Sequence, residues 1–419
     1  MGRRHPAPPD PGPSGRAAHR GTPRPTHRPA LTPRFPRAAG LRPSPQPMER
    51  SVKRLIVDTH ASSCYFRTSI AGEGRKALVQ ITERCNLHCA HCFVSSTAVG
   101  ADLSLAAFTD RVLPRLLAAR VERITLTGGE PFVHHDVLGF CRAVRAAGLP
   151  VGICTNATQT SDAQITALTE LGGVHINVSF DGFRAGSHGK FRGDRSSFAT
   201  TLATTRAFAA AGLLQGLLST PNALTDPSEF ADLCAFAVET GAQYVLMNPL
   251  SSFGRGVRSQ GRMAAPDQVM RAIRAVTARF ADALDVVQIR FPNDTLPLGG
   301  CDAGKLIYVY TDGQVAVCPY LVFAARTPIS RYPDSDFLVG NILHEQDIAT
   351  GLDGYDFHRR YTVGANPTCA GCDLSSGCGK GCPAAVISRG GLIGDLDDEQ
   401  CPVPPGPSRR RLPLTVAGR

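Results

Sequence analysis

Three cysteines lie close together in the stretch "ERCNLHCAHCF" at residues 83–93. The cysteines are Cys85, Cys89 and Cys92, at the spacing C-x3-C-x2-C, and His88 and His91 lie between them. Three thiolates at short spacing can bind three irons of a [4Fe–4S] cluster and leave the fourth iron open. They can also bind zinc if a histidine supplies the fourth ligand. The triplet therefore indicates a metal centre but does not decide which metal it holds.

A second candidate site follows a predicted strand at residues 123–127. The stretch "TGGEPF" places Gly128, Gly129 and Glu130 at the end of this strand. Two glycines let the backbone approach a ligand closely, and a carboxylate can accept hydrogen bonds from an ammonium group. The alternative is a tight turn in which Glu130 caps a helix beginning at Pro131. The stretch alone leaves both interpretations open.

Seven further cysteines lie in the last third of the chain. Two of them flank Gly313 in the spacing C-x11-G-x4-C, and four more follow the spacing C-x2-C-x5-C-x3-C. The seven are Cys301, Cys318, Cys369, Cys372, Cys378, Cys382 and Cys401. The chain has 14 cysteines and no recognisable secretion signal, and clustered cysteines in such a protein favour metal ligation over disulfides. The four-cysteine block taken alone also fits a zinc ribbon.

Strand and helix patterns alternate regularly from residue 77 onward. Short apolar runs predict strands at 77–82, 123–127, 150–155, 174–180, 213–219 and 243–249. Helical spacing predicts helices at 104–119, between Val137 and a Gly148 stop, after a Ser161 cap, and near 196–212, 227–240 and 266–283. Pro114 should kink or shorten the first of these helices. The alternation predicts an α/β fold, a partial (β/α)6 TIM-like barrel with its chemistry at the carboxyl ends of the strands.

The alternation stops near residue 293, where the chain becomes rich in glycine, cysteine and turns. Residues 305–317 predict a hairpin around Asp312 and Gly313. The expected divisions are a disordered Pro- and Arg-rich tail at 1–47, a lead-in at 48–76, the barrel at 77–292, a small cysteine-rich domain at 293–401 and a basic tail at 402–419.

The net charge of +10 comes from the two tails. Residues 1–47 hold nine Arg and one Asp, and residues 402–419 hold four Arg without an acidic residue, so the body carries about 10 − 8 − 4 = −2. A nucleic-acid-binding surface on the body is therefore not indicated. The first tail is too rich in proline to pack a core, and translated sequence ahead of a true start at Met48 is the alternative. The chain shows no apolar run long enough to span a membrane, and we expect it in the cytoplasm.

The motifs at 85–92 and 127–132 together resemble the radical S-adenosylmethionine (SAM) family, which has C-x3-C-x2-C after strand one and G-G-E-P after strand two. The resemblance implies that Cys85, Cys89 and Cys92 ligate a catalytic [4Fe–4S] cluster whose open iron binds the amino and carboxylate groups of SAM. Gly128, Gly129 and Glu130 would hold the methionine ammonium. His91, at a position that is usually aromatic, would lie beside the adenine.

Later strands resemble the same family. "CTNAT" (154–158) resembles its T-N-G, with Asn156 in place and Ala157 replacing the glycine. "VSFDG" (178–182) resembles its S-x-D-G, so Ser179 and Asp181 would face the ribose or the methionine end. "HGKFRG" (188–193) is similar to its H-D-x-x-R-G, and Arg192 would grip the SAM carboxylate. The structural alternatives are that Asn156 closes a turn and that His188 caps a helix.

The seven later cysteines match the order of the SPASM domain, which follows the radical SAM barrel in a large subgroup. The resemblance implies two auxiliary iron–sulfur clusters with interleaved ligands. One would be held by Cys369, Cys372, Cys378 and Cys401, and the other by Cys301, Cys318 and Cys382. Some members add a cysteine just before the first of the seven, but residues 293–300 contain none, which leaves an open iron, another ligand or a smaller cluster. We assign no site to Cys64, Cys141, Cys154 or Cys234.

The resemblance implies an oxidoreductase or maturase that reductively cleaves SAM to a 5′-deoxyadenosyl radical and abstracts hydrogen from its substrate. We expect a ribosomally made peptide that acquires a crosslink or a related modification. The alternatives are dehydrogenation or epimerisation of a small alcohol or aminoglycoside-type metabolite and, in a different class, a zinc-binding nucleic-acid module. Pro319 after Cys318 argues against sulfatase maturation, whose subgroup has Asp there.

The expected partners are a peptide or small-molecule substrate and an electron donor such as flavodoxin or ferredoxin. Residues 48–76 are too short for a winged-helix domain, so a leader peptide would need another docking surface or a separate leader-peptide-binding protein. We expect no membrane and no nucleic acid as a partner. The loop at 251–262 could hold a peptide or a carboxylate through Arg255 and Arg258, and its alternative interpretation is a solvated flexible loop.

Overall fold

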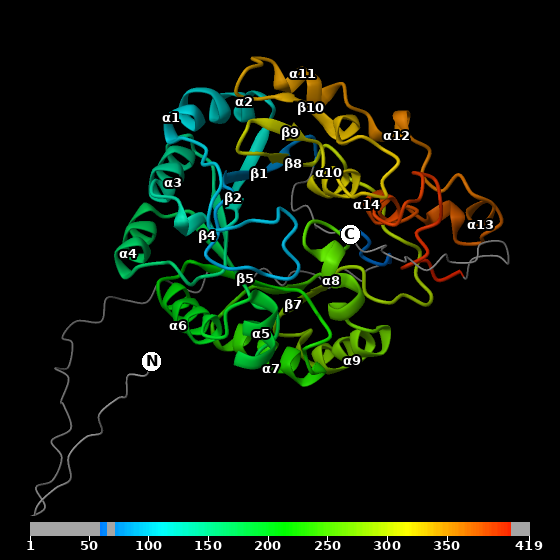
Figure 1. The fold of residues 1–419 in the computed structure, drawn as a ribbon, viewed down its shortest axis with the longest axis horizontal. Helices are drawn as coiled ribbons and strands as arrows, with labels where there is room; N and C mark the ends of the chain where they lie inside the picture. Colours follow the sequence, from blue (N-terminus) through cyan, green and yellow to red (C-terminus); the bar gives the residue numbers. More distant parts are fainter. Residues whose placement is uncertain (1–58, 65–71, 404–419) are drawn as a thin grey trace, which may run out of the picture. The chain divides into compact units, whose positions relative to one another are not determined.

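The computed structural model describes residues 59–64 and 72–403. The predicted tail at 1–47 and all but the first two residues of the predicted tail at 402–419 lie outside this part. The described residues contain a ten-stranded sheet in the order β10-β9-β8-β1-β2-β3-β4-β5-β6-β7 (Figure 1). Its strands are β1 (Arg75–Thr82), β2 (Val121–Gly128), β3 (Val151–Thr155), β4 (Val174–Ser179), β5 (Leu214–Ser219), β6 (Tyr244–Met247), β7 (Asp285–Gln288), β8 (Leu306–Val309), β9 (Gln314–Ala316) and β10 (Leu338–Asn341).

The six predicted strands, β1 to β6, pair in chain order and in parallel, which confirms the partial barrel. Their side chains are buried on both faces, as expected for strands covered by helices, and Ile153, Val178 and Val245 are fully buried. A seventh parallel strand, β7, adds to β6 and was not predicted, because its four residues include an exposed Asp and only one buried side chain. At the other end β8 pairs in parallel with β1.

Helices cover the outer side of the sheet (Figure 1). They are α3 (Val137–Ala146), α4 (Asp162–Leu171), α6 (Ser197–Ala210), α7 (Pro227–Glu239) and α9 (Asp267–Thr277), all near their predicted positions. Ser161 begins α4 with a capping box to Gln164, as its sequence predicts, and Asp226 does the same for α7 with Glu229.

The first predicted helix is continuous but irregular. It consists of α1 (Leu105–Ala107), a π-helical turn η1 (Phe108–Val112) and α2 (Leu113–Ala118). Pro114 directly follows the π-helical turn, where the irregular hydrogen-bond pattern accommodates a residue that has no backbone N–H to donate. The prediction of a disturbance was right, but the helix is widened rather than shortened.

Two helices near the barrel edge were not predicted, α5 (Ala185–Arg192) and α8 (Gly256–Met263). The flexible loop expected at 251–262 is therefore wrong for most of its length. Short helices complete the chain: η2 (Pro131–Val133), η3 (Ala278–Phe280), α10 (Pro319–Ala325), η4 (Asp334–Phe337), α11 (Ile348–Asp353), α12 (Phe357–Arg360), α13 (Pro367–Ala370), η5 (Ser375–Gly377) and α14 (Pro383–Ile387).

The predicted hairpin is present, with β8 and β9 antiparallel and Gly313 at a positive φ of 87° in its turn. Because β8 also pairs with β1, the hairpin extends the barrel sheet, and β10 adds to β9. The strand–helix alternation ends near residue 293 in the sequence. The sheet nevertheless continues past this point, because strands from both sides of it pair with each other. Among the described residues, every helix is too short or too polar to cross a membrane.

Candidate active site

The three cysteines of the first motif lie in a loop at residues 83–103, the cluster loop, which follows the carboxyl end of β1. Backbone hydrogen bonds join its two arms, from Cys85 N to Thr97 O at 2.7 Å and from Glu83 N to Ala101 O at 2.9 Å. Cys89 is buried, and Cys85 and Cys92 are half-buried. The loop therefore holds three thiols at the edge where parallel α/β folds carry their chemistry.

The cluster-loop thiols are suited to a bound cation. Burial raises the pKa of Cys85 to about 11 and that of Cys89 to about 12, so each keeps its proton in the absence of a metal. The amide of Leu87 already donates to Cys85 Sγ at 3.4 Å. A metal that replaces the thiol protons would remove the cost of burying these sulfurs as thiolates.

Helix α5 supports the cluster loop through its last residues. The amides of His88 and Ala90 donate to the carbonyl oxygens of Arg192 and Phe191 at 3.2 and 2.8 Å. The His88 side chain is exposed, as expected for a residue outside the metal site. The sequence "HGKFRG" therefore has a structural task in addition to any contact with a cofactor.

Gly128 and Gly129 bring the end of β2 against the cluster loop. A Cβ added to Gly128 would overlap the Thr82 carbonyl oxygen, and one added to Gly129 would overlap that of Arg84. The amides of Gly129 and Glu130 donate to these same two oxygens at 2.9 Å. The two glycines thus approach the backbone of Thr82 and Arg84. This contact fixes the position of the neighbouring Cys85.

Glu130 is buried, with 1% of its surface exposed. Its carboxylate accepts hydrogen bonds from Asn156 N at 2.7 Å, Thr155 Oγ1 at 2.7 Å and Phe132 N at 3.1 Å. The last of these caps η2, so the capping alternative is observed. Oε2 has one donor and keeps a lone pair, which leaves room for the predicted ammonium contact. Burial raises the pKa of Glu130, and the three donors act against this rise.

Asp181 and Arg192 form a buried ion pair with 2.9 Å between Oδ2 and Nη2. The other oxygen of Asp181 accepts from Thr220 N at 2.8 Å. Burial disfavours the charge of Asp181, but Arg192 and the nearby His91 and His188 outweigh it and lower the pKa of this carboxyl. Two residues expected to bind different parts of SAM therefore contact each other, and their cofactor contacts stay predictions.

His91 stacks on Phe191 with ring centroids 5.1 Å apart and an interplanar angle of 4°. Its Nδ1 lies 3.5 Å from Asp181 Oδ2. Burial lowers the pKa of His91, and the imidazole is neutral at pH 7. The ring thus belongs to the aromatic and charged wall beside the cluster loop, while its contact with adenine stays a prediction.

Asn156 follows β3 and closes a turn, as the structural alternative proposed. Its Oδ1 accepts from Thr158 N at 2.9 Å, and its Nδ2 donates to Asn86 Oδ1 at 3.0 Å. The same amide nitrogen lies 4.0 Å from Cys85 Sγ. Ala157 has a positive φ of 61°, a conformation that favours the glycine of the T-N-G pattern. Ser179 lies half-buried at the end of β4.

Arg255 contacts the cluster loop, and sequence reasoning assigned it to a substrate. Its guanidinium donates to Cys89 O at 2.9 Å and to Ser96 O at 2.6 Å, and its amide donates to Cys92 O at 3.0 Å. The guanidinium of Arg255, one of two that could hold a peptide or a carboxylate, thus donates to the cluster loop through Nε and Nη1. No local motif could have revealed this contact, since it joins positions more than 150 residues apart.

A groove lies beside the cluster loop, between its residues 93–99, helix α8 and the β8–β9 hairpin. Phe93 and Tyr310 lie in its wall, and the Tyr310 hydroxyl is buried without a hydrogen-bond partner among the described residues. Val99 and Val257 are 78% and 42% exposed in the same wall. Arg258 lines the groove, as expected for a residue at the active edge.

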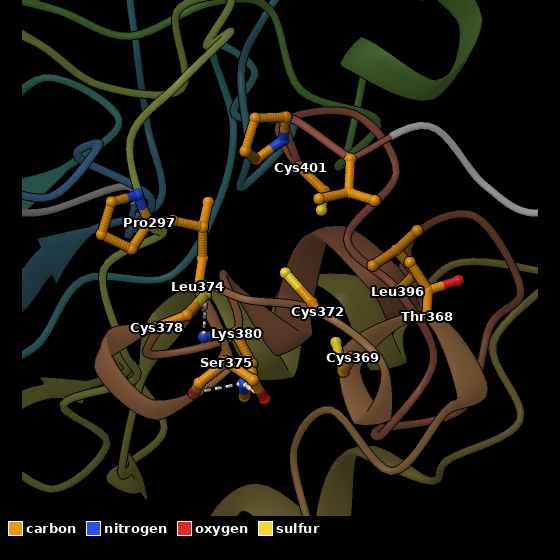
Figure 2. A pocket seen from close by; sticks show the side chains of 12 residues that line it. Pro297, Thr368, Cys369, Cys372, Leu374, Ser375, Cys378, Lys380, Leu396 and Cys401 are labelled. Carbon is orange, nitrogen blue, oxygen red and sulfur yellow. Dashed lines mark hydrogen bonds between the residues drawn. The ribbon is translucent and has the colours of Figure 1, made fainter.

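Four cysteines of the C-terminal set surround one pocket (Figure 2). They are Cys369, Cys372, Cys378 and Cys401. The amides of Leu298 and Lys380 donate to Cys378 Sγ at 3.3 and 3.4 Å, and Asn366 Nδ2 lies 3.3 Å from Cys369 Sγ. N–H donors to sulfur are a feature of iron–sulfur sites, where they tune the cluster. This is the grouping that the resemblance implied.

The second group predicted by the resemblance also shares one environment. Cys318 and Cys382 lie close enough to Cys301 to raise its pKa, and Cys382 does the same for Cys318. Sequence reasoning missed Cys64, whose thiol lies beside that of Cys382 and donates to Gly300 O at 2.7 Å. No signal near Cys64 in the sequence points to this contact, because more than 230 positions separate Cys64 from each of the three cysteines.

The spacing of the sulfurs bears on the choice of metal. A tetrahedral zinc site with Zn–S bonds near 2.3 Å places its sulfurs about 3.8 Å apart. In the described part of the chain, no three cysteines bring their sulfurs within 4.8 Å of one another. The cysteine sets are thus spaced more widely than the ligands of a bound zinc ion, and the spacing leaves room for a cluster of several irons.

Comparison with known proteins places this geometry in a family. Residues 79–237 match the radical SAM superfamily. This part of the chain is a radical SAM domain. It includes the cluster loop, the glycines that fix it, Glu130 and the Asp181–Arg192 pair.

Two curated relatives of the radical SAM domain are pre-heme d1 synthase of Dinoroseobacter shibae and the sporulation killing factor maturation protein SkfB of Bacillus subtilis. The first is 27% identical over 49% of this chain and 50% of its own length, and the second is 26% identical over 57% and 59%. The chain thus spans between half and three fifths of the length of these relatives.

SuiB of Streptococcus suis has the same fold over a larger part of the chain. Its structure bound to S-adenosylmethionine has a TM-score of 0.61 at 15% identity and covers 78% of this chain and 77% of its own. Its structure bound to the precursor peptide SuiA has a TM-score of 0.60 at 15% identity and covers 79% and 76%. At this identity the comparison establishes the fold, which includes the region beyond the barrel.

Proposed function

We propose that this chain is a radical SAM/SPASM enzyme that cleaves SAM reductively and oxidises a ribosomally made peptide by hydrogen abstraction. The observation that carries the proposal is the convergence of the cluster loop, Glu130 and the Asp181–Arg192 pair at one edge of the barrel. The open spacing of the cysteine sulfurs supports iron–sulfur centres over the zinc-binding alternative.

The residues around the cluster loop fit a [4Fe–4S] cluster and SAM. Cys85, Cys89 and Cys92 would hold the cluster, which with bound SAM supplies a 5′-deoxyadenosyl radical. Glu130 would accept the methionine ammonium through Oε2, while Thr155 and Asn156 hold the carboxylate in place. Hydrogen bonds from the amides of the loop to carbonyl oxygens of α5 would keep the three sulfurs in position without the side chains having to reorganise.

The charged pair near the cluster would orient the rest of SAM. Arg192 has Cys85 and Cys89 among its electrostatic neighbours, and its cation would counter the negative charge of the cluster ligands. It could share its guanidinium between Asp181 and the SAM carboxylate, because five N–H donors are available. His91, stacked on Phe191, would offer the adenine a flat neutral surface.

The C-terminal cysteines would hold two auxiliary iron–sulfur clusters. The four thiols around one pocket supply a complete set of four cysteine ligands, and the N–H donors to Cys378 support that role. Such centres could accept the second electron that leaves the substrate after hydrogen abstraction. Reduced thiols in this number favour a cytoplasmic enzyme, in which a ferredoxin or flavodoxin would deliver the first electron.

The groove beside the cluster loop favours a peptide as substrate. An extended wall with aromatic, aliphatic, hydroxyl and guanidinium groups can bind a chain that carries different side chains. SkfB is named for the maturation of sporulation killing factor, and SuiB has been solved with its precursor peptide, which supports the same class. The leader of that peptide could be presented by a separate binding protein.

Isotope transfer tests the proposed substrate. The reduced enzyme with SAM is incubated with candidate short peptides that carry deuterium on their side chains, and mass spectrometry follows both products. We expect deuterium in 5′-deoxyadenosine and a peptide that has lost hydrogen. Unchanged peptides together with oxidation of a small alcohol would refute the peptide class and leave the radical chemistry in place.

A further inference from the structure

The segment at residues 59–64, the lead-in strand, is bound to the chain just before Cys301. Ala61 N donates to Pro297 O at 2.9 Å, and Gly299 N donates to Ala61 O at 2.9 Å. Ala61 forms a parallel bridge with Leu298. The segment thus lies along residues 297–300, although more than 230 positions separate the two in sequence.

A buried arginine also secures the lead-in strand. Arg290 donates from its amide to Ser62 O at 2.8 Å and from Nη1 to Ser63 O at 3.2 Å. The same guanidinium pairs with Asp397, at 2.8 Å from Nη2 to Oδ1, and Asp397 accepts from Cys382 N at 3.0 Å. One charged network therefore holds the lead-in strand and the backbone of Cys382 in a fixed relation.

The thiol at the end of the lead-in strand enters the group of Cys301, Cys318 and Cys382. Cys64 Sγ lies 2.7 Å from the carbonyl oxygen of Gly300, the residue next to Cys301. The Cys382 thiol lies beside it, and Cys301 and Cys318 lie within electrostatic range. Four sulfurs therefore lie in one neighbourhood, and all four are free thiols.

Backbone amides lie near the other three sulfurs. The amide of Ala303 acts to lower the pKa of Cys301, those of Leu321 and Tyr320 act to lower that of Cys318, and that of Ala385 acts to lower that of Cys382. Such donors stabilise negative charge on cluster ligands and tune the potential of the centre. The group thus has the features of a second four-thiol site, with its fourth thiol supplied from the opposite end of the chain.

We propose that Cys64 is the fourth ligand of the auxiliary centre held by Cys301, Cys318 and Cys382. The inference rests on the proposed function, which makes that centre an iron–sulfur cluster. With four thiolates the cluster has no open iron, so it carries electrons and does not bind the substrate. The same contact gives the lead-in strand a task, since a cluster ligand fastens the segment before the barrel to the C-terminal region.

The count of cysteines agrees with this assignment. Three in the cluster loop, four around the pocket and four with Cys64 account for 3 + 4 + 4 = 11 of the 14. The remaining three are Cys141, Cys154 and Cys234, which lie on α3, β3 and α7. Cys141 and Cys234 are fully buried among apolar side chains and serve as matched controls.

The test compares Cys64→Ala and Cys64→Ser with Cys141→Ala in a full chain whose cluster-loop cysteines are replaced by alanine. Without the catalytic cluster, only the auxiliary centres contribute to iron content and to the electron paramagnetic resonance spectrum. We expect both Cys64 variants to change the spectrum of one centre and Cys64→Ala to lose about one iron or the whole centre. A spectrum and iron content equal to those of Cys141→Ala would overturn the proposal.

A second measurement uses the unaltered chain and does not depend on the folding of a variant. Iron-loaded protein is alkylated under anaerobic conditions before and after chelation of the iron, and each cysteine is quantified by mass spectrometry. We expect Cys64 to be protected at least ten-fold by iron, together with Cys301, Cys318 and Cys382. Equal alkylation of Cys64 in both samples, or a Cys64–Cys382 disulfide in the iron-loaded protein, would overturn the proposal.

These results separate this inference from the proposed function. A purified chain that binds zinc and no iron would refute the proposed function and the centre with it. A chain with iron and a functional catalytic cluster in which Cys64 is unprotected would refute only the role of Cys64.

Discussion

At the residue scale, the cluster loop depends on glycines that have no room for a side chain. The carbonyl oxygens of Thr82 and Arg84 occupy the positions that the Cβ atoms of residues 128 and 129 would need. The two glycines of the motif "TGGEP" therefore allow two backbone segments to lie close together. This close packing also fixes the position of Glu130, which follows them. Sequence reasoning found these residues but assigned the glycines to a ligand.

We expect Gly129→Ala to loosen the cluster loop. The added methyl would overlap the Arg84 carbonyl and touch Cys85 Cβ, and such overpacking costs about 1–3 kcal/mol. Iron bound by Cys85, Cys89 and Cys92 should fall, as measured by iron content after gel filtration. The matched control is Gly261→Ala on α8, where a Cβ has open space and should stabilise the helix slightly. Equal iron content in both variants would contradict this account.

The carboxylate of Glu130 predicts a pH dependence of SAM binding. Burial raises the pKa of Glu130, so the group takes up a proton at a higher pH than an exposed glutamate does. Because the ammonium contact needs the ionised form, affinity for SAM should fall as the pH drops through this raised pKa. The contribution of the group to folding has the opposite sense, since its stabilisation is present in acid and lost as the pH rises through the raised pKa.

Titration calorimetry of SAM binding at several pH values measures the effect. Glu130→Gln should bind SAM more weakly at neutral pH and should lose the acid dependence. A variant that retains the pH profile of the unaltered protein would show that another group controls binding.

At the scale of elements, the regular strands and helices could be read from the sequence, and the elements that complete the site could not. Hydrophobic periodicity and the Ser161 cap are local signals, and they predicted β1 to β6 and the helices that cover them. Helix α8 lacked such a signal because it is polar and glycine-bearing, with Gly256 as its only buried residue. Its importance comes from Arg255 at its start, which contacts a loop far away in the sequence.

We expect Arg255→Ala to increase the motion of the cluster loop. The side chain donates two hydrogen bonds to carbonyl oxygens of the loop, and hydrogen bonds from charged groups contribute about 1.5–3 kcal/mol each. Hydrogen–deuterium exchange of residues 89–97 should become faster. Arg258→Ala, on the same helix, should leave this exchange unchanged, because within the described residues the Arg258 side chain donates no hydrogen bond to the loop backbone. Similar exchange in the two variants would argue against a structural role for Arg255.

At the scale of the whole molecule, a buried ion pair and groups of cysteines connect segments that are far apart in the sequence. The Arg290–Asp397 pair is fully buried and joins the segment that follows β7 to the last part of the described chain. Cys64 and the four-thiol pocket add two further links across the C-terminal region. The grouping of Cys369, Cys372, Cys378 and Cys401 was predictable from their order, whereas the place of Cys64 depends on the fold and could not be predicted.

Removal of one partner of the buried pair should destabilise the protein strongly. Asp397→Asn leaves the Arg290 charge buried with less compensation, which costs about 3–5 kcal/mol. Thermal unfolding of the iron-free chain should show a lower midpoint. The control is Asp294→Asn, which breaks the exposed pair with Arg271 and should have little effect. Equal midpoints would mean that the network does not hold the C-terminal region in place.

The central claim is that the cluster loop performs radical SAM chemistry, and product formation tests it most directly. The anaerobically purified chain is reduced with dithionite in the presence of SAM, and 5′-deoxyadenosine is quantified alongside iron and zinc. We predict a brown, iron-containing protein that forms 5′-deoxyadenosine and loses this activity in Cys85→Ala. A colourless zinc protein, or one that forms the product equally well without Cys85, would contradict the claim.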